Sequence, residues 1–350
     1  MNHRPKVLVA LSGGVDSAVC AHLLLRQGYD VAGVVLKMSP AHEIAVEQAK
    51  VCADKLGIPL LVRDETAAFE EKVVRPFIDE YRAGRTPNPC IVCNPNVKFR
   101  ALVETADEHG YDYIATGHYA DMIERDGAVL LKIGKSRSRD QTYMLHRLGQ
   151  DVLRRLLLPL ADYEKTAVRE IAAECGLPCA SQPDSQEICF IPDNDYAGYI
   201  ERVDGACPPG DFIGPDGAVC GRHKGILHYT IGQRKGLGIA LGQPVFVTRI
   251  DSARNTVQLG LPEQLMTNRL VLAGLASASG QPFSAPFDGL VKIRSTAVPV
   301  PARIEPVDPT HCRIRFPAPL RAPAEGQSAA IYDGEDVLLG GGFIVENGLA

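Results

Sequence analysis

The sequence lacks the features that mark several classes of protein. Its apolar runs all fall short of the roughly 18 residues that a membrane span needs. The N-terminus leads straight into a strand-like run, so we expect no signal peptide and no membrane partner. The net charge of −5 over 350 residues excludes a bulk polycation, so any nucleic-acid contact must use locally concentrated basic residues. The ten cysteines lack the compact spacing of a disulfide scaffold, which favours a reducing, cytoplasmic compartment.

Short apolar runs alternate with helical patterns up to about residue 200. We expect strands at 6–11, 31–36, 60–62 and 113–116 and helices at 17–27, 43–56, 67–82, 97–109 and 164–175. This alternation predicts an α/β fold, in which a doubly wound parallel sheet carries helices on both faces. Asp126-Gly127 lies between two apolar runs and predicts a β-hairpin.

The last 150 residues have a different texture, because they hold 14 of the 25 prolines and 20 of the 33 glycines. Short strand-like runs recur there, at 245–250, 256–259, 270–272, 289–294, 312–316 and 328–332. Short strands between turn residues predict two small β-rich domains, the last of them a β-barrel. The segment 278–288, rich in Ser, Pro and Gly, is interpreted as a linker.

A strand-to-helix loop near the N-terminus has the composition of an anion site. Ser12-Gly13-Gly14 follows an apolar run, and Asp16-Ser17 opens a helix. Free backbone N–H groups at a helix N-terminus favour a phosphate, and glycines allow its close approach. The Gly-Lys-Ser/Thr ending of the common ATPase loop is absent, and an ordinary capped turn is the alternative. The full string Ser-Gly-Gly-Val-Asp-Ser resembles the pyrophosphate loop of ATP pyrophosphatases.

Three cysteines lie in chemically unusual surroundings. Cys90 and Cys93 form a C-x-x-C pair in a segment with three prolines in nine residues, a density that should prevent a regular helix. Basic residues at 82, 85, 98 and 100 flank the pair, and nearby cations lower the pKa of a thiol. A structural zinc half-site is the alternative, although the chain has no second C-x-x-C. Cys189 follows an acidic, polar run, so these two segments have the chemistry for thiols that meet in space.

Six sequence segments together resemble the bacterial tRNA-uridine 2-sulfurtransferases, or tRNA 2-thiouridylases. They occur in this order: residues 12–17, 86–99, 115–120 (ATGHYA), 139–145 (RDQTYML), 184–191 (DSQEICFI) and 228–239 (HYTIGQRKGLGI). The resemblance runs from about residue 5 to about residue 345. It implies an ATP pyrophosphatase domain of the HUP type at 1–200, a central β-rich tRNA-binding domain at 201–268 and a C-terminal β-barrel at 269–350.

The resemblance also implies the reaction and its groups. ATP, with Mg²⁺, would adenylate O2 of uridine 34, the wobble base, and Cys189 would carry a sulfane sulfur to C2. Cys93 would release or transfer that sulfur through a disulfide with Cys189. The nucleotide would contact Ala10, Leu11, Ser12, Gly13, Gly14, Val15, Asp16, Ser17, Leu36 and Gly117.

The partners implied are the anticodon loops of tRNA for Lys, Glu and Gln and a sulfur-donor protein, either a cysteine desulfurase or a relay, but not DNA. The base is reached easily because the anticodon loop is single-stranded. The residues that match tRNA-contacting positions are Asn88, Pro89, Cys90, His118, Arg139, Asp140, Gln141, Arg294, Ser295 and Gln327. Basic residues at 132, 135 and 137 and at 222, 224, 234 and 235 agree with a tRNA face.

Three positions depart from the family pattern. Cys90 stands where many members have Asp, Arg139 where Lys is usual, and Ser295 where Tyr is usual. Because Cys90 adds a third thiol, Cys90, Cys93 and Cys189 have the ligand type for a [4Fe–4S] cluster. The sequence leaves the persulfide and iron–sulfur routes open. It also leaves two rivals: an ATP pyrophosphatase acting on a small molecule, and an iron–sulfur or tRNA-binding protein without this activity.

Overall fold

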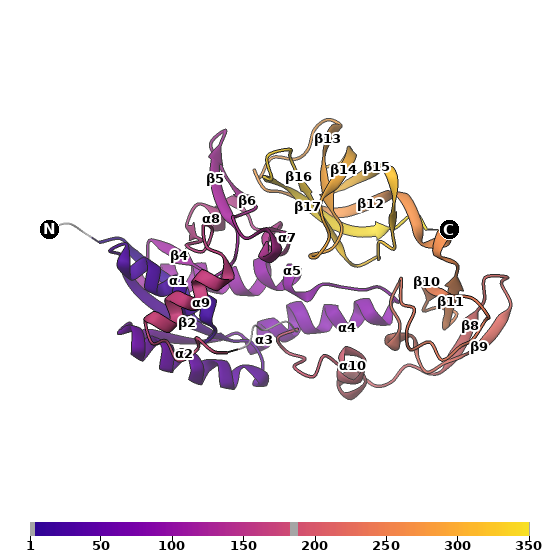
Figure 1. Ribbon diagram of the computed structural model, residues 1–350, viewed down its shortest axis with the longest axis horizontal. Helices are drawn as coiled ribbons and strands as arrows, with labels where there is room; N and C mark the ends of the chain where they lie inside the picture. The colour runs from indigo at the N-terminus through magenta and orange to yellow at the C-terminus, as the bar shows by residue number, and fades with distance from the viewer. Residues whose placement is uncertain (1–3, 183–187, 350) are drawn as a thin grey trace.

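The computed structural model describes residues 4–182 and 188–349. Its first part is a parallel sheet with the strand order β3-β2-β1-β4-β7, on the left of Figure 1. The strands are β1 (Lys6–Ala10), β2 (Asp30–Lys37), β3 (Leu60–Asp64), β4 (Tyr113–Ala115) and β7 (Leu156–Leu157). β1 pairs in parallel with β2 on one side and with β4 on the other. The carboxyl ends of these three strands therefore open at the same edge of the sheet.

Helices pack on both faces of this sheet. They are α1 (Val15–Arg26), α2 (Glu43–Leu56), α3 (Thr66–Phe69), α4 (Arg75–Arg82), α5 (Pro89–Cys93), α6 (Phe99–His109), α7 (Thr142–Leu145), α8 (Gln150–Leu153) and α9 (Lys165–Glu174). Because successive strand side chains point to opposite faces, Leu8 enters one core while Val7 and Val9 enter the other. α1, α2 and α9 share the core of Val7, and α4 and α6 share that of Leu8. The predicted doubly wound architecture is confirmed.

One local expectation is wrong: the prolines at 87–95 do not prevent a helix. α5 begins at Pro89, where a missing N–H costs no helical bond, and the Asn88 side chain caps it by accepting from the Cys90 N–H at 3.2 Å. Pro95 lies in the following wide helical turn, η3 (Asn94–Lys98), which leads directly into α6. A similar wide turn, η2 (Glu70–Val74), joins α3 to α4.

The predicted hairpin is present as β5 (Asp121–Arg125) and β6 (Ala128–Lys132), which pair antiparallel. Asp126 and Gly127 both have positive φ, at 52° and 74°. Positive φ at both central residues is the requirement of the tight turn that suits the twist of two paired strands.

A connecting helix, α10 (Tyr196–Asp204), leads into a small sheet with the order β10-β11-β8-β9. Its strands are β8 (Gly210–Ile213), β9 (Val219–His223), β10 (Phe246–Asp251) and β11 (Thr256–Gly260). Phe212, Val247 and Val257 are fully buried and form its centre. This sheet lies at the right-hand end of the molecule in Figure 1.

The chain ends in a closed barrel with the order β12-β15-β14-β13-β16-β17. Its strands are β12 (Met266–Ser277), β13 (Phe287–Lys292), β14 (Val300–Asp308), β15 (His311–Arg321), β16 (Ser328–Tyr332) and β17 (Leu338–Glu346). The barrel lies above α5 and α7 in Figure 1, and Ala330, Tyr332 and Leu338 join the core of the first domain. The predicted β-rich architecture with a final barrel is confirmed.

The interpretation of 278–288 as a linker is wrong. β12 pairs with both β15 and β17, so this segment is a connection inside the barrel. Among the described helices, none has the length and apolar character required to cross a membrane.

Candidate functional site

The loop between β1 and α1 is shaped by its own hydroxyl groups. Ser17 Oγ donates to the Gly14 carbonyl at 2.9 Å and accepts from the Ser12 N–H at 3.1 Å. Ser12 Oγ lies 3.2 Å from Ser17 Oγ. At the N-terminus of α1, the N-cap residue Gly14 provides no side-chain cap. The first backbone N–H groups of the helix are therefore available to an anion such as a nucleotide phosphate. The residues present therefore fit ATP.

Asp16 is held by two residues that sequence reasoning missed. Tyr119 Oη donates to Asp16 Oδ1 at 2.7 Å, and Lys165 Nζ lies 2.8 Å from both carboxylate oxygens. Tyr119 belongs to the ATGHYA segment and could have been found there, whereas nothing in the sequence singles out Lys165. The Asp16 carboxylate is therefore already paired with a cation.

Gly117 explains why this strand end approaches the loop so closely. A Cβ at position 117 would lie 2.7 Å from the Asp16 carbonyl carbon and 2.8 Å from the Ser17 nitrogen. Both of these atoms are backbone and cannot turn away. The structure thus places Gly117 against the first turn of α1, as expected for a residue beside the nucleotide.

Cys93 lies at the same edge of the sheet as this loop. Its Sγ is buried and donates to Met38 Sδ at 3.9 Å, and Met38 directly follows β2. Leu36, in β2, is also buried in this region. The parallel sheet therefore brings the predicted nucleotide residues and the C-x-x-C segment to one edge, although 79 positions separate Gly14 from Cys93 in the chain.

Cys90, Cys93 and Cys189 gather in one neighbourhood with Lys98. Cys189 is exposed, yet the protein atoms around it raise the pKa of its thiol to about 12, and Cys90 and Cys93 add to this effect. Burial raises the pKa of Cys93 to about 11, and Cys90 again adds to it while Lys98 opposes it. Cys93 and Phe190, the residue after Cys189, belong to the same buried core, so the structure places the two cysteine segments in one region of the first domain. The acidic part of the Cys189 segment, at 184–187, lies outside the described residues.

An aromatic cluster anchors the chain beside Cys189. Phe190 is buried and packs edge-to-face against Phe69, Phe77 and Tyr199, with ring centroids 5.4 Å apart in each pair. Each such pair contributes about 1 kcal/mol beyond its buried area. The exposed thiol is therefore carried on a fixed backbone.

The thiols do not meet as a metal site. Within 4–182 and 188–349, no group of three or more His, Cys, Asp or Glu side chains is arranged to hold a metal ion. The residues as placed do not fit a [4Fe–4S] cluster. Ligation by Cys90, Cys93 and Cys189 stays a prediction.

The residues predicted to contact tRNA fall into two groups. Arg139 and Arg294 are exposed, and Ser295 is half-buried. His118 stacks on Phe99 with centroids 5.9 Å apart, and burial, aided by Lys98, lowers its pKa to about 3, so the imidazole is neutral at pH 7. Asn88, Pro89 and Cys90 form the first turn of α5, next to Cys93.

The other group faces inward. Asp140 forms an ion pair at 2.8 Å with Lys292 of the barrel, and the two side chains are only 3% and 6% exposed. The Gln141 side-chain oxygen accepts from the Tyr119 N–H at 2.8 Å, and the Gln141 N–H donates to the Tyr119 carbonyl at 3.0 Å. Gln327 reaches across to the segment before α5. Asp140 and Gln327 thus tie the barrel to the first domain, whereas Gln141 bonds within the first domain, and the sequence revealed neither role.

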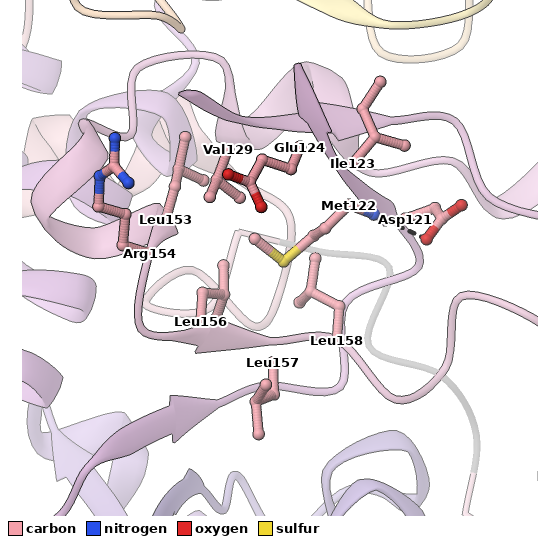
Figure 2. A pocket seen from close by; sticks show the side chains of 10 residues that line it. All are labelled: Asp121, Met122, Ile123, Glu124, Val129, Leu153, Arg154, Leu156, Leu157 and Leu158. Carbon is pink, nitrogen blue, oxygen red and sulfur yellow. Dashed lines mark hydrogen bonds between the residues drawn. The ribbon is translucent and has the colours of Figure 1, made fainter. Parts of the chain in front are cut away.

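A cavity of about 310 Å³ lies apart from all of these residues, between the β5–β6 hairpin and β7 (Figure 2). Its apolar lining consists of leucines at 153 and 156–158 with Met122, Ile123 and Val129. None of the predicted site residues contributes to it.

A parallel-sheet domain with a strand-to-helix loop at its carboxyl edge, followed by two β domains, is the architecture of a HUP-type enzyme with appended β domains. Three family descriptions match in chain order: a tRNA methyl transferase HUP domain at 5–193, a tRNA methyl transferase PRC-barrel domain at 199–260 and an aminomethyltransferase β-barrel domain at 269–344. The chain belongs to the tRNA-specific 2-thiouridylase family, and it is an enzyme of the sulfurtransferase class.

Individual relatives match almost end to end. The tRNA-specific 2-thiouridylase MnmA of Clostridium acetobutylicum is 44% identical over 97% of this chain and 99% of its own. That of Clostridioides difficile is 46% identical over 97% of this chain and 98% of its own. Among solved structures, a 4-thiouridine synthetase in complex with RNA and bound ATP is similar over 51% of this chain and 43% of its own, with 24% identity and a TM-score of 0.36.

Proposed function

We propose that this protein catalyses the ATP-dependent 2-thiolation of uridine 34 in tRNA for Lys, Glu and Gln. The observation that carries the proposal is the common buried core of Cys93 and Phe190, the residue after Cys189, at the sheet edge that also holds the loop of Ser12–Ser17. Family membership supplies the substrate class. A small-molecule ATP pyrophosphatase would need the loop but neither the paired thiols nor the barrel.

ATP supplies the activation in this scheme: transfer of its adenylyl group to O2 of the uracil releases pyrophosphate and makes O2 a leaving group. Residues 10–17, with Leu36 and Gly117, would hold the nucleotide. Lys165 and Tyr119 fix the Asp16 carboxylate and so keep the first turn of α1 in place.

Sulfur transfer then uses both thiols. A donor protein of the cysteine desulfurase or relay type passes a sulfane sulfur to Cys189, which holds it as a persulfide. The terminal sulfur attacks C2, and AMP leaves with the former O2. The Cys93 thiolate then attacks Cys189 Sγ. The bond between Cys189 Sγ and the transferred sulfur breaks, and C2 keeps that sulfur as a thiocarbonyl.

This sequence of bonds balances. The two thiols give up two electrons and become a Cys93–Cys189 disulfide, while the sulfane sulfur is reduced to the thiocarbonyl level. An external thiol reductant restores the pair for the next turnover. Because the pKa values of both thiols are raised, the resting pair is protonated at pH 7, and Lys98 is the cation placed to stabilise a thiolate when it forms.

The test uses two tRNA transcripts for Lys that differ only at position 34, one with U and one with C. Each is incubated with the protein, ATP, Mg²⁺ and a persulfide-loaded donor, then run on a mercury-affinity gel, which retards thiolated RNA. We expect retardation of the U34 transcript alone, and only with ATP. Retardation of neither transcript would reject the proposed reaction, and retardation of both would place the modification at another base.

A further inference from the structure

A turn of the barrel, residues 324–327, is bonded to the segment that leads into α5. The Thr86 N–H donates to the Glu325 carbonyl at 2.8 Å, and Gln327 Nε2 donates to the Thr86 carbonyl at 2.8 Å. The backbone N–H and the carbonyl of Thr86 therefore both form hydrogen bonds with the barrel. Thr86 Oγ1 is buried and makes no bond within the described structure, so this contact depends on the backbone of Thr86 and the side chain of Gln327.

The turn fits tightly against this segment. Gly326 has φ of +88°, and a Cβ there would lie 3.0 Å from the Thr86 nitrogen and 3.1 Å from Arg85 Cβ. A side chain at this position would push the turn away from the cysteine segment. The contact is thus shaped for close approach of the two backbones.

The next barrel residue supports the other end of α5. The Ser328 carbonyl accepts from Tyr143 Oη at 2.8 Å, in a buried contact. The Met144 carbonyl in turn accepts from Asn94 Nδ2 at 2.7 Å. Asn94 directly follows Cys93, so neighbouring residues of one barrel turn brace α5 before its first residue and after its last.

We infer that Gln327 is a positioning residue, which sets the geometry of Cys93 through Thr86. This differs from the role that family resemblance predicts, a direct contact with tRNA. It also gives the barrel a part in the chemistry itself, because the cysteine helix takes its position from a domain more than two hundred residues further along the chain. The inference deepens the proposed function, and its effect on thiolation rests on that function.

The first experiment needs no tRNA, ATP or sulfur donor. Gln327→Met keeps the length of the side chain and removes its donor, and Gln281→Met makes the same change at an exposed position of the barrel. Both proteins are alkylated with iodoacetamide, and modification at Cys93 is followed by tandem mass spectrometry. Loss of one buried hydrogen bond should raise the Cys93 alkylation rate about fivefold in Gln327→Met and leave it unchanged in Gln281→Met.

The second experiment separates positioning from tRNA contact. In single turnovers at saturating tRNA, Gln327→Met should thiolate about fivefold more slowly while its Kd for tRNA stays that of the wild type. Gln327→Asn, whose amide is too short to reach Thr86, should likewise raise the alkylation rate of Cys93 and lower the thiolation rate.

A raised Kd with a normal rate at saturation, and unchanged Cys93 alkylation in both variants, would overturn the inference and make Gln327 a tRNA contact. If the wild-type protein fails to thiolate tRNA, the proposed function fails, but the alkylation result still decides whether Gln327 positions Cys93.

Discussion

The two halves of the site are held in place by different means. In the nucleotide loop, the bond between the Ser12 and Ser17 hydroxyls joins residues five positions apart. In the cysteine segment, the bond between Gln327 and Thr86 joins residues 241 positions apart. The loop is shaped by its own hydroxyl groups and by residues of the same domain, whereas the cysteine helix is also held by the docked barrel. Damage to the barrel should therefore impair sulfur transfer before it impairs nucleotide binding.

The largest expected effect separates the two halves by chemistry. Cys93→Ser and Cys189→Ser should each lower thiolation by about a thousandfold or more, because a hydroxyl can neither carry sulfane sulfur nor form a disulfide. ATP binding, measured by calorimetry, should stay at the wild-type level in both.

Cys220→Ser is the matched control for these variants. Cys220 Sγ donates to the Phe212 carbonyl at 3.5 Å in the central sheet, and a serine hydroxyl can keep that bond. An active Cys189→Ser variant would contradict the assigned carrier.

The next effect concerns the docking of the barrel. Lys292→Met would leave the Asp140 carboxylate buried without its cation, and removing one partner of a buried pair costs about 3 kcal/mol in the free energy of unfolding. Chemical denaturation should show this loss, and thiolation should fall more than ATP binding does. The exposed Lys72→Met serves as the control, and equal stability of the two variants would show that the ion pair does not hold the barrel.

A smaller effect is expected on the nucleotide side alone. Gly117→Ala would place a methyl group 2.7 Å from the Asp16 backbone, and such overpacking costs about 2 kcal/mol. We expect ATP to bind about thirtyfold more weakly, with the rate of Cys93 alkylation unchanged. Gly334→Ala, where a Cβ would meet nothing within 4 Å, should bind ATP normally. Equal affinity of the two variants would show that Gly117 does not border the nucleotide.

The last comparison probes the surroundings of the thiols. With a pKa raised to about 12, Cys189 is protonated at pH 7, and its thiolate fraction grows as the pH rises. Its alkylation rate should therefore increase about tenfold per pH unit from pH 7 to pH 10. A small-molecule thiol alkylated in parallel should level off near pH 9. A plateau of the Cys189 alkylation rate near pH 9 would contradict the raised pKa of its thiol.

The sequence predicted the parts that depend on local pattern. The alternation of strands and helices in the first domain, the hairpin at Asp126-Gly127 and the loop at Ser12–Ser17 all follow from neighbouring residues. The strands β7, β8, β9, β14 and β17 were missed. β14 contains Pro301 and Pro306, and β17 contains three consecutive glycines, residues that normally argue against a strand. Closure of the barrel supplies the pairing that local propensity lacks.

In the site, too, the residues that belong to local motifs were predicted, and those that depend on distant contacts were not. Family motifs identified Cys93, Cys189 and the nucleotide loop, and their roles stay predictions. Lys98 was recognised beside the C-x-x-C pair, but Lys165 and Lys292 were not predicted as parts of the site, because a lone lysine carries no pattern and only the folded chain shows its partner. Asp140 and Gln327 were identified, but their inward contacts depend on how two domains dock, which no spacing in the sequence encodes.

The most direct test of the account follows one sulfur atom through one turnover. Protein carrying a labelled persulfide on Cys189 is mixed with ATP and unmodified tRNA for Lys, quenched in acid, and analysed for labelled 2-thiouridine and for the Cys93–Cys189 disulfide. The account predicts one disulfide formed for each labelled base at position 34. Label that reaches the tRNA without this disulfide, or a disulfide that forms without transfer of the label, would contradict it.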